Sequence, residues 1–155
     1  MKKYRLFLIL ILIISCSEKS QELLNINASI QQSNELKENP LLMHPITFSI
    51  KPKDSTMSTL YGNEIAFDYA KQHSDFKYPK GAILYEVTWR QKSDELWFGG
   101  NIPKEIYSVE KISFDNDNSV YEKFKGKTLK KTKVDDSEEK LRKYFISEQK
   151  MTVSK

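Results

Sequence analysis

Apolar and polar residues alternate with a period of two in two parts of this chain. The alternation spans residues 44–52 and, more strongly, residues 82–91, where one face carries Ile83, Tyr85, Val87 and Trp89. In the first of these stretches the alternating apolar residues are Ile46, Phe48 and Ile50. A period of two is typical of a strand with one buried face, so both stretches are predicted to be β-strands.

The C-terminal half predicts more strands. Residues 107–114 and 119–124 are rich in aromatic and β-branched residues and flank the turn sequence DNDN, which indicates a hairpin. Residues 93–96 predict a turn, and LWFGG at 96–100 predicts a short strand that two glycines end. Residues 53–63 are expected to form a turn or loop that closes on Gly62 and Asn63.

Two segments have helical spacing instead. Residues 64–73 place one apolar face on Ile65, Ala66, Tyr69, Ala70 and His73. Residues 135–150 predict a second helix, with Asp136 and Glu139 as a capping box and Glu139 and Lys143 as an i,i+4 ion pair. Its buried stripe is expected to consist of Leu141, Tyr144 and Phe145.

The order strand, helix, several strands, helix predicts an α+β fold, a mostly antiparallel sheet with packed helices. This domain is expected to span residues 44–155. Residues 16–43 are rich in Ser, Gln, Asn, Glu and Lys and have no sustained periodicity, so they are interpreted as a flexible tether.

The N-terminus has the features of an export signal. Lys2, Lys3 and Arg5 precede an apolar run at 6–14 that is too short to cross a bilayer, so residues 1–15 are interpreted as a lipoprotein signal peptide. Ile13 to Cys16 resembles the bacterial lipobox, which makes Cys16 the predicted lipid attachment site. The alternative is an uncleaved N-terminal anchor with an incidental cysteine.

The lipobox implies an exported protein that is anchored in the bacterial cell envelope through its N-terminal lipid. Ser17 favours the outer membrane. The formal charge of +4 falls to about +1 once Lys2, Lys3 and Arg5 are removed, so no concentrated basic face remains and no nucleic-acid partner is expected.

Four segments together resemble the cytochrome P-460 family of exported haem proteins. They are TMSTLYGNEIAFDYAKQHSD at 56–75, YPKGAILYEVTWRQ at 78–91, DELWFGGNIP at 94–103 and SVEKISF at 108–114. The resemblance implies a cytochrome P-460-like fold and hydroxylamine or small-gas chemistry at a c-type haem. That haem is attached through a Cys-x-x-Cys-His motif, which this chain lacks because its single cysteine is Cys16.

Covalent haem c is therefore not expected. We expect an envelope lipoprotein with a non-catalytic domain that binds a small ligand or has an accessory role. The alternative is a redox protein with non-covalent haem, ligated by His44, His73, Tyr61 or Tyr107. A further alternative is an unrelated α+β lipoprotein.

The remaining candidate residues have ordinary structural interpretations. His44 and His73 are interpreted as partly buried or capping residues rather than iron ligands. Asp115, Asp117 and Ser119 begin like a calcium loop, but Val120 and Gly126 replace its glycine and glutamate, so a hairpin turn is preferred and no metal site is predicted. Trp89, Trp97 and Phe98 could line a pocket for a planar ligand, but they are expected to form the core. The sequence indicates no catalytic residue.

Overall fold

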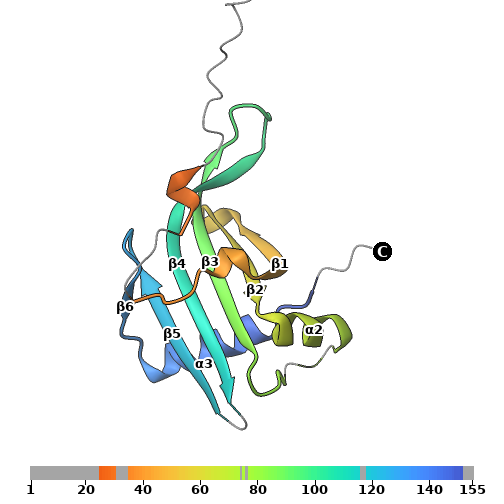
Figure 1. The fold of residues 1–155 in the computed structure, drawn as a ribbon. Coiled ribbons are helices and arrows are strands. Elements are labelled where there is room, and N and C mark those ends of the chain that lie inside the picture. The colour runs from red at the N-terminus through yellow and green to blue at the C-terminus, as the bar shows by residue number, and fades with distance from the viewer. Residues whose placement is uncertain (1–24, 31–34, 74, 76, 116–117, 152–155) are drawn as a thin grey trace, which may run out of the picture.

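The computed structural model describes residues 25–30, 35–73, 75, 77–115 and 118–151. Six strands form one sheet in the order β1-β2-β3-β4-β5-β6, and every neighbouring pair is antiparallel (Figure 1). The strands are β1 (His44–Lys51), β2 (Thr56–Gly62), β3 (Ile83–Ser93), β4 (Asn101–Asp115), β5 (Asn118–Lys125) and β6 (Lys130–Thr132).

The helices are few and short. Two α-helices, α2 (Glu64–Gln72) and α3 (Asp136–Ser147), and three 3₁₀ turns, η1 (Ile26–Ala28), η2 (Pro40–Leu42) and η3 (Pro52–Asp54), occur in the described part of the chain. Among these described residues, no helix has the length and apolar character needed to cross a membrane.

The predicted α+β class with packed helices is therefore wrong, because the protein has a β-rich fold built on one antiparallel meander. One cause is β2, which the sequence predicted as a loop. The buried positions of β2 alternate, but they include the small polar residues Thr56 and Ser58 beside Leu60, so hydrophobicity does not reveal the strand.

A β-bulge changes the face of β1. The pairing of β1 with β2 shifts between Pro45 and Thr47, so Ile46 is buried in the core while Phe48 and Ile50 point to the other face and are exposed. The prediction that these three side chains share a buried face is wrong for that reason.

One face of the sheet is covered by residues 25–30 and 35–43, which we call the N-terminal segment. Figure 1 shows this segment in front of the sheet and α3 behind it. Leu36 is buried against Tyr85, Val87 and Trp89, and Tyr85 donates a hydrogen bond to Glu38 at 2.9 Å. The described part of the predicted tether is therefore packed against the sheet and completes one of its two apolar layers.

The other face carries a second apolar cluster and α3. Ile46, Leu60, Leu84, Ile112 and Ile146 belong to this cluster. The predicted stripe of α3 is wrong, since Leu141, Tyr144 and Phe145 are all exposed. The N-cap also differs from the prediction, because Asp135 accepts hydrogen bonds from the amides of Ser137 and Glu138.

Several local predictions are confirmed. Residues 64–72 are helical and are capped by Asn63, whose side chain accepts from the amide of Ala66. The Glu139–Lys143 ion pair has an N–O distance of 3.0 Å. Strands β4 and β5 form a hairpin in which Asp115 is opposite Asn118, with residues 116 and 117 outside the described residues.

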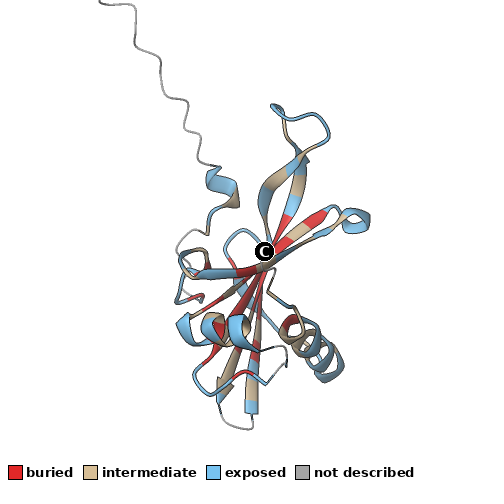
Figure 2. Ribbon diagram, turned by 90° about the vertical axis from the view of Figure 1, so that its right-hand side faces the viewer, coloured by how far each residue is buried: buried red, intermediate tan, exposed pale blue. Residues whose placement is uncertain are grey.

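Strands β3 and β4 extend past the other strands as a projecting hairpin. Figure 2 shows this arm, with an exposed tip, beyond the body of the sheet. The tip is formed by residues 94–100, where a short strand and core packing of Trp97 and Phe98 were predicted. Both predictions are wrong, because Trp97 is 74% exposed and Phe98 is fully exposed, whereas Trp89 is buried as expected.

Candidate functional site

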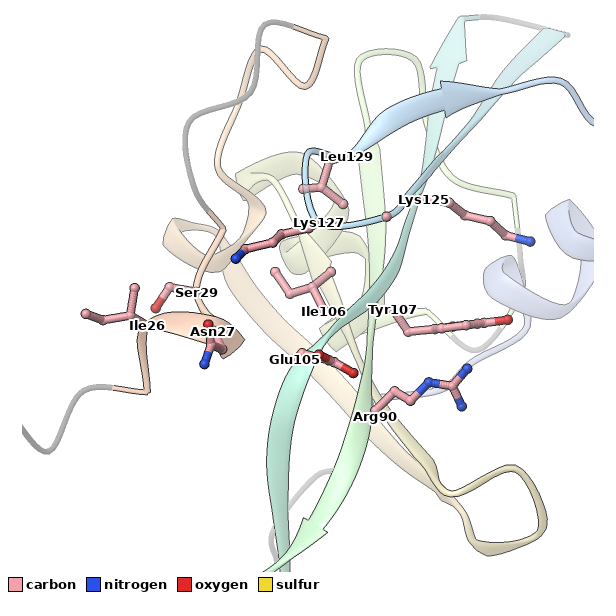
Figure 3. Close-up of a pocket in the computed structure, with 11 residues that line it drawn as sticks. Ile26, Asn27, Ser29, Arg90, Glu105, Ile106, Tyr107, Lys125, Lys127 and Leu129 are labelled. Carbon is pink, nitrogen blue, oxygen red and sulfur yellow. The ribbon is translucent and has the colours of Figure 1, made fainter.

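A cleft of about 490 Å³ lies between η1 and the sheet at the base of the projecting arm. Figure 3 shows its walls, which come from the N-terminal segment, from β3 and β4, and from the end of β5 with the turn that follows. Its lining combines charged and apolar residues: Ile26, Asn27, Ser29, Arg90, Glu105, Ile106, Tyr107, Lys125, Gly126, Lys127 and Leu129.

Two hydrogen bonds hold the N-terminal wall of this cleft. Asn25 donates from Nδ2 to the carbonyl of Pro103 at 2.6 Å, and Trp89 donates from Nε1 to the carbonyl of Ala28 at 2.9 Å. Since both bonds connect residues far apart in the sequence, the wall forms only when the N-terminal segment packs on the sheet.

Irregular backbone shapes the other two walls. The β3–β4 pairing shifts at Trp89 and again at Gln91, which brings Ile106 and Tyr107 to adjacent positions of the cleft lining. After β5 the chain turns through Gly126 and Leu129, which both have positive φ angles of 79° and 49°. The turn is closed by a 3.0 Å bond from the amide of Leu129 to the carbonyl of Gly126.

The cleft has an excess of positive charge. Arg90 and Lys127 lie in this lining with a single acid, Glu105. The amine of Lys125 points toward α3 (Figure 3), where the hydrogen bond from Lys123 and, after it, the charge of Lys125 lower the pKa of Glu138. Within the described residues Arg90, Lys127 and Glu105 form no salt bridge. Arg90 instead stacks over the ring of Tyr107, with 4.6 Å between the guanidinium carbon and the ring centroid. An anion entering the cleft would therefore meet cations that have no carboxylate partner.

A second group of polar residues lies buried between the sheet and α3. Glu86 and Glu110 are only 2% and 4% exposed, and they are direct cross-strand partners on β3 and β4. Two like charges in this arrangement repel each other, so the pair requires a cation. Arg142 of α3 supplies it, donating from Nε to Glu110 at 2.7 Å and from a terminal nitrogen to Glu86.

Further donors complete the buried glutamate pair. Gln149 donates to Glu86 at 2.8 Å, and Tyr121 donates to Glu110 at 2.5 Å. Lys123 lies 4.0 Å from Glu110 and also pairs with Glu138. Every buried side-chain nitrogen or oxygen of the described residues has a hydrogen-bond partner, so this group is a fully satisfied polar core.

The pKa shifts reflect this network. Burial, with the hydrogen bond to the Glu110 carboxylate, raises the pKa of Tyr121 above its ordinary value. Burial acts to lower the pKa of Arg142, but its hydrogen bond to Glu110 and the nearby carboxylate charges outweigh that effect and raise it. Both groups therefore keep their protons throughout the physiological range.

The cleft and the polar core have a common boundary. Arg90 and Tyr107 also line a second hollow of about 440 Å³, whose other walls include Thr88, Glu110 and Arg142. The Arg90–Tyr107 pair thus lies between the cleft and the buried glutamate pair.

The structure separates most of the residues that the sequence singled out. His44 stacks on Phe67 with ring centroids 4.7 Å apart, and His73 stacks on Tyr69 at 4.2 Å. Both aromatic partners belong to α2, and neither histidine lines the cleft. Tyr107 lines the cleft, whereas Tyr61 packs against the apolar cluster beneath the N-terminal segment and is not among the lining residues. Cys16 and the signal peptide lie outside the described residues.

The donor set does not fit a haem. Thioether attachment needs two cysteines, and the chain has one. Neither histidine reaches the cleft, and Tyr107 is engaged by Arg90. In the part of the chain that the structure describes, no cluster of three or more His, Cys, Asp or Glu side chains could hold a metal ion.

Sequence reasoning missed the cleft cations and the buried glutamates. Glu86 did carry a usable signal, since it is a single charge in the middle of the apolar stretch ILYEVTW, and Glu110 has a similar place in SVEKISF. A charge within a buried strand needs a partner, and that partner was not visible because Arg142 is 56 residues from Glu86.

Comparisons with known proteins assign no family to this chain. No family model matches the chain, and no curated protein matches it. The fold and the two polar sites therefore rest on this chain's own residues.

Proposed function

We propose that this chain is a lipid-anchored binding protein of the bacterial cell envelope, and that its cleft takes a small organic anion. The cleft carries the proposal, because it combines the apolar side chains of Ile106 and Leu129 with two cations, Arg90 and Lys127, that form no salt bridge among the described residues. Sites for small ligands are concave, largely apolar and equipped with a few polar groups that orient the ligand.

Cations and apolar residues in one site select for a particular ligand class. A carboxylate or phosphate can pair with Arg90 or Lys127. An aliphatic or aromatic body can contact the apolar part of the lining, which is formed by Ile26, Ile106 and Leu129. Under this proposal haem chemistry, which the resemblance to the cytochrome P-460 family implies, is not part of the function.

Binding can be measured with 1-naphthoate and its neutral analogue 1-naphthalenemethanol as probes. We expect saturable one-to-one binding of the acid in a calorimetric titration and weaker binding of the alcohol. Lys127→Glu should weaken naphthoate binding by roughly tenfold or more, because it replaces an attractive charge by a repulsive one. Lys133→Glu is the matched control, since Lys133 is exposed and does not line the cleft.

Equal affinity for the acid and the alcohol, or an equal response to both lysine variants, would refute an anion site in this cleft. Haemin is a third probe. A saturable Soret band that Tyr107→Phe abolishes would instead support the alternative of a redox protein with non-covalent haem.

The anchor is tested separately. Because the sequence around Cys16 resembles a lipobox, Cys16→Ala should abolish incorporation of labelled palmitate and leave uncleaved precursor in the cell. Ser15→Ala, which keeps a small residue before the cysteine, should still be labelled. Normal labelling of the Cys16→Ala protein would show that the lipid is attached elsewhere or not at all.

A further inference from the structure

We propose that the tip of the β3–β4 arm inserts into the interfacial layer of the bilayer to which the chain is anchored. The tip is formed by residues 94–100. This inference rests on the proposed lipid anchor and is independent of the proposed ligand cleft.

The tip exposes three consecutive large apolar side chains. Leu96 is 94% exposed, Trp97 is 74% exposed and Phe98 is fully exposed. Single apolar residues are common on protein surfaces, but a contiguous group is characteristic of an interaction site. Tryptophan is in addition enriched where membrane meets water, since its ring is apolar and its N–H still reaches a polar partner.

The tip is a defined turn that holds these side chains outward. The amide of Asp94 donates to the carbonyl of Gly100 at 2.9 Å, and the amide of Gly100 donates to the carbonyl of Trp97 at 3.0 Å. The side chain of Asp94 accepts from the amide of Leu96 at 2.9 Å. These bonds satisfy part of the tip's backbone internally, which lowers the cost of moving it out of bulk water.

The arm places the tip at a suitable distance from the anchor. Asn25 is bonded to Pro103 on the arm, and about nine residues separate Asn25 from Cys16, a reach of roughly 30 Å when extended. From Pro103 to Trp97 is six residues, or at most roughly 20 Å. The lipid and the tip can therefore contact the same bilayer.

The charges near the tip favour apolar insertion over attraction to anionic lipid. Lys92 and Lys104 on the arm are balanced by Asp94 and Glu95, which are the first two residues of the tip. The proposed partner is therefore a lipid interface that contacts Leu96, Trp97 and Phe98. We expect the tip to bind vesicles of pure phosphatidylcholine, and we expect 0.5 M salt not to remove it from them.

The test uses the mature, acylated chain in phosphatidylcholine vesicles that contain lipid brominated near the headgroup end of the acyl chain. The chain has two tryptophans, of which Trp89 is buried and Trp97 is exposed. We expect bromine to quench the emission of Trp97. The Trp97→Tyr variant, which retains Trp89 as its single tryptophan, should be unaffected.

An acylated chain whose Trp97 is not quenched would overturn the inference while leaving the anchor and the cleft intact. Cross-linking of Trp97 to a protein in native membranes without quenching in vesicles would also overturn it, in favour of a protein partner. If mass spectrometry finds Cys16 unmodified, the anchor fails, and the full chain is sedimented with vesicles instead.

In that case Trp97→Ser combined with Phe98→Ser should reduce vesicle binding by on the order of tenfold. Phe48→Ser is the matched control, because Phe48 is an exposed aromatic residue on β1, away from the tip. Equal binding of the control and of the tip variant would refute the role of the tip.

Discussion

Arg142→Ala is expected to destabilise the folded protein by about 3–5 kcal/mol, because it leaves two buried carboxylates without their shared cation. Glu86 and Glu110 face each other across β3 and β4, and Arg142 donates to both. Once the guanidinium is removed, the pair loses two charge-assisted hydrogen bonds and its electrostatic compensation together. Denaturation by urea, followed by circular dichroism, measures the loss directly.

Two controls isolate the cause. Lys140→Ala removes an exposed cation from the same helix and should change the free energy of unfolding by less than about 0.5 kcal/mol. Glu86→Gln in the Arg142→Ala background should recover part of the loss, because it removes one of the two repelling charges. If Arg142→Ala and Lys140→Ala had equal effects, the network would contribute nothing specific to stability.

A chain shortened to begin at Leu42 is expected to lose most of its stability. The deletion removes Leu36 and Pro40, and it uncovers the sheet face that carries Tyr85, Val87 and Trp89. Leu36→Ala alone should cost about 2–5 kcal/mol, the usual range for a buried leucine, and the complete segment contributes more than one such side chain.

The comparison is with chains that begin at residues 17 and 25. Both of these chains keep the whole of the N-terminal segment that the structure describes. Exposure of the apolar face should also make the short chain bind a hydrophobic dye. If the chain beginning at Leu42 unfolded at the same midpoint as the longer ones, the N-terminal segment would contribute nothing to the stability of the domain.

Strands β1, β3, β4 and β5 could be predicted from alternation or from aromatic and β-branched composition, whereas β2 and β6 could not. In β3 the residues Tyr85, Val87 and Trp89 lie on one buried face as expected. Strand β2 was missed because half of its buried face is Thr56 and Ser58, whose burial depends on a polar environment that other strands supply. Because β2 was predicted as a loop, the predicted sheet was too small, and the class of the fold was wrong for the same reason.

Helix α3 was predicted in position but not in orientation. Its apolar residues at 141, 144 and 145 suggested the buried side, yet Arg142 and Ile146 face the sheet. The orientation follows from Glu110, which is 32 residues away, and local periodicity carries no information about a partner at that distance. The same limit applies to Trp97 and Phe98, because an apolar run reads alike in a core strand and in an exposed tip.

The candidate cleft could not have been predicted for a related reason. Its walls come from η1, from the bulged part of β4 and from the turn at 126–129, three regions that are distant in the sequence. Only Tyr107 among its lining residues had been singled out, and for a different chemistry.

The meander ends at β1 on one side and at β6 on the other, and both outer strands resist pairing with another molecule. Strand β6 has only three residues, two of them lysines, and the amide of Lys131 already donates to Glu35. Strand β1 carries Pro45 and a bulge beside it, and it ends in Lys51. Proline, bulges, lysines and short length are the means by which sheets avoid edge-to-edge aggregation. If the proposed lipid anchor concentrates the protein on a membrane surface, these two edges keep its sheet from templating fibrils.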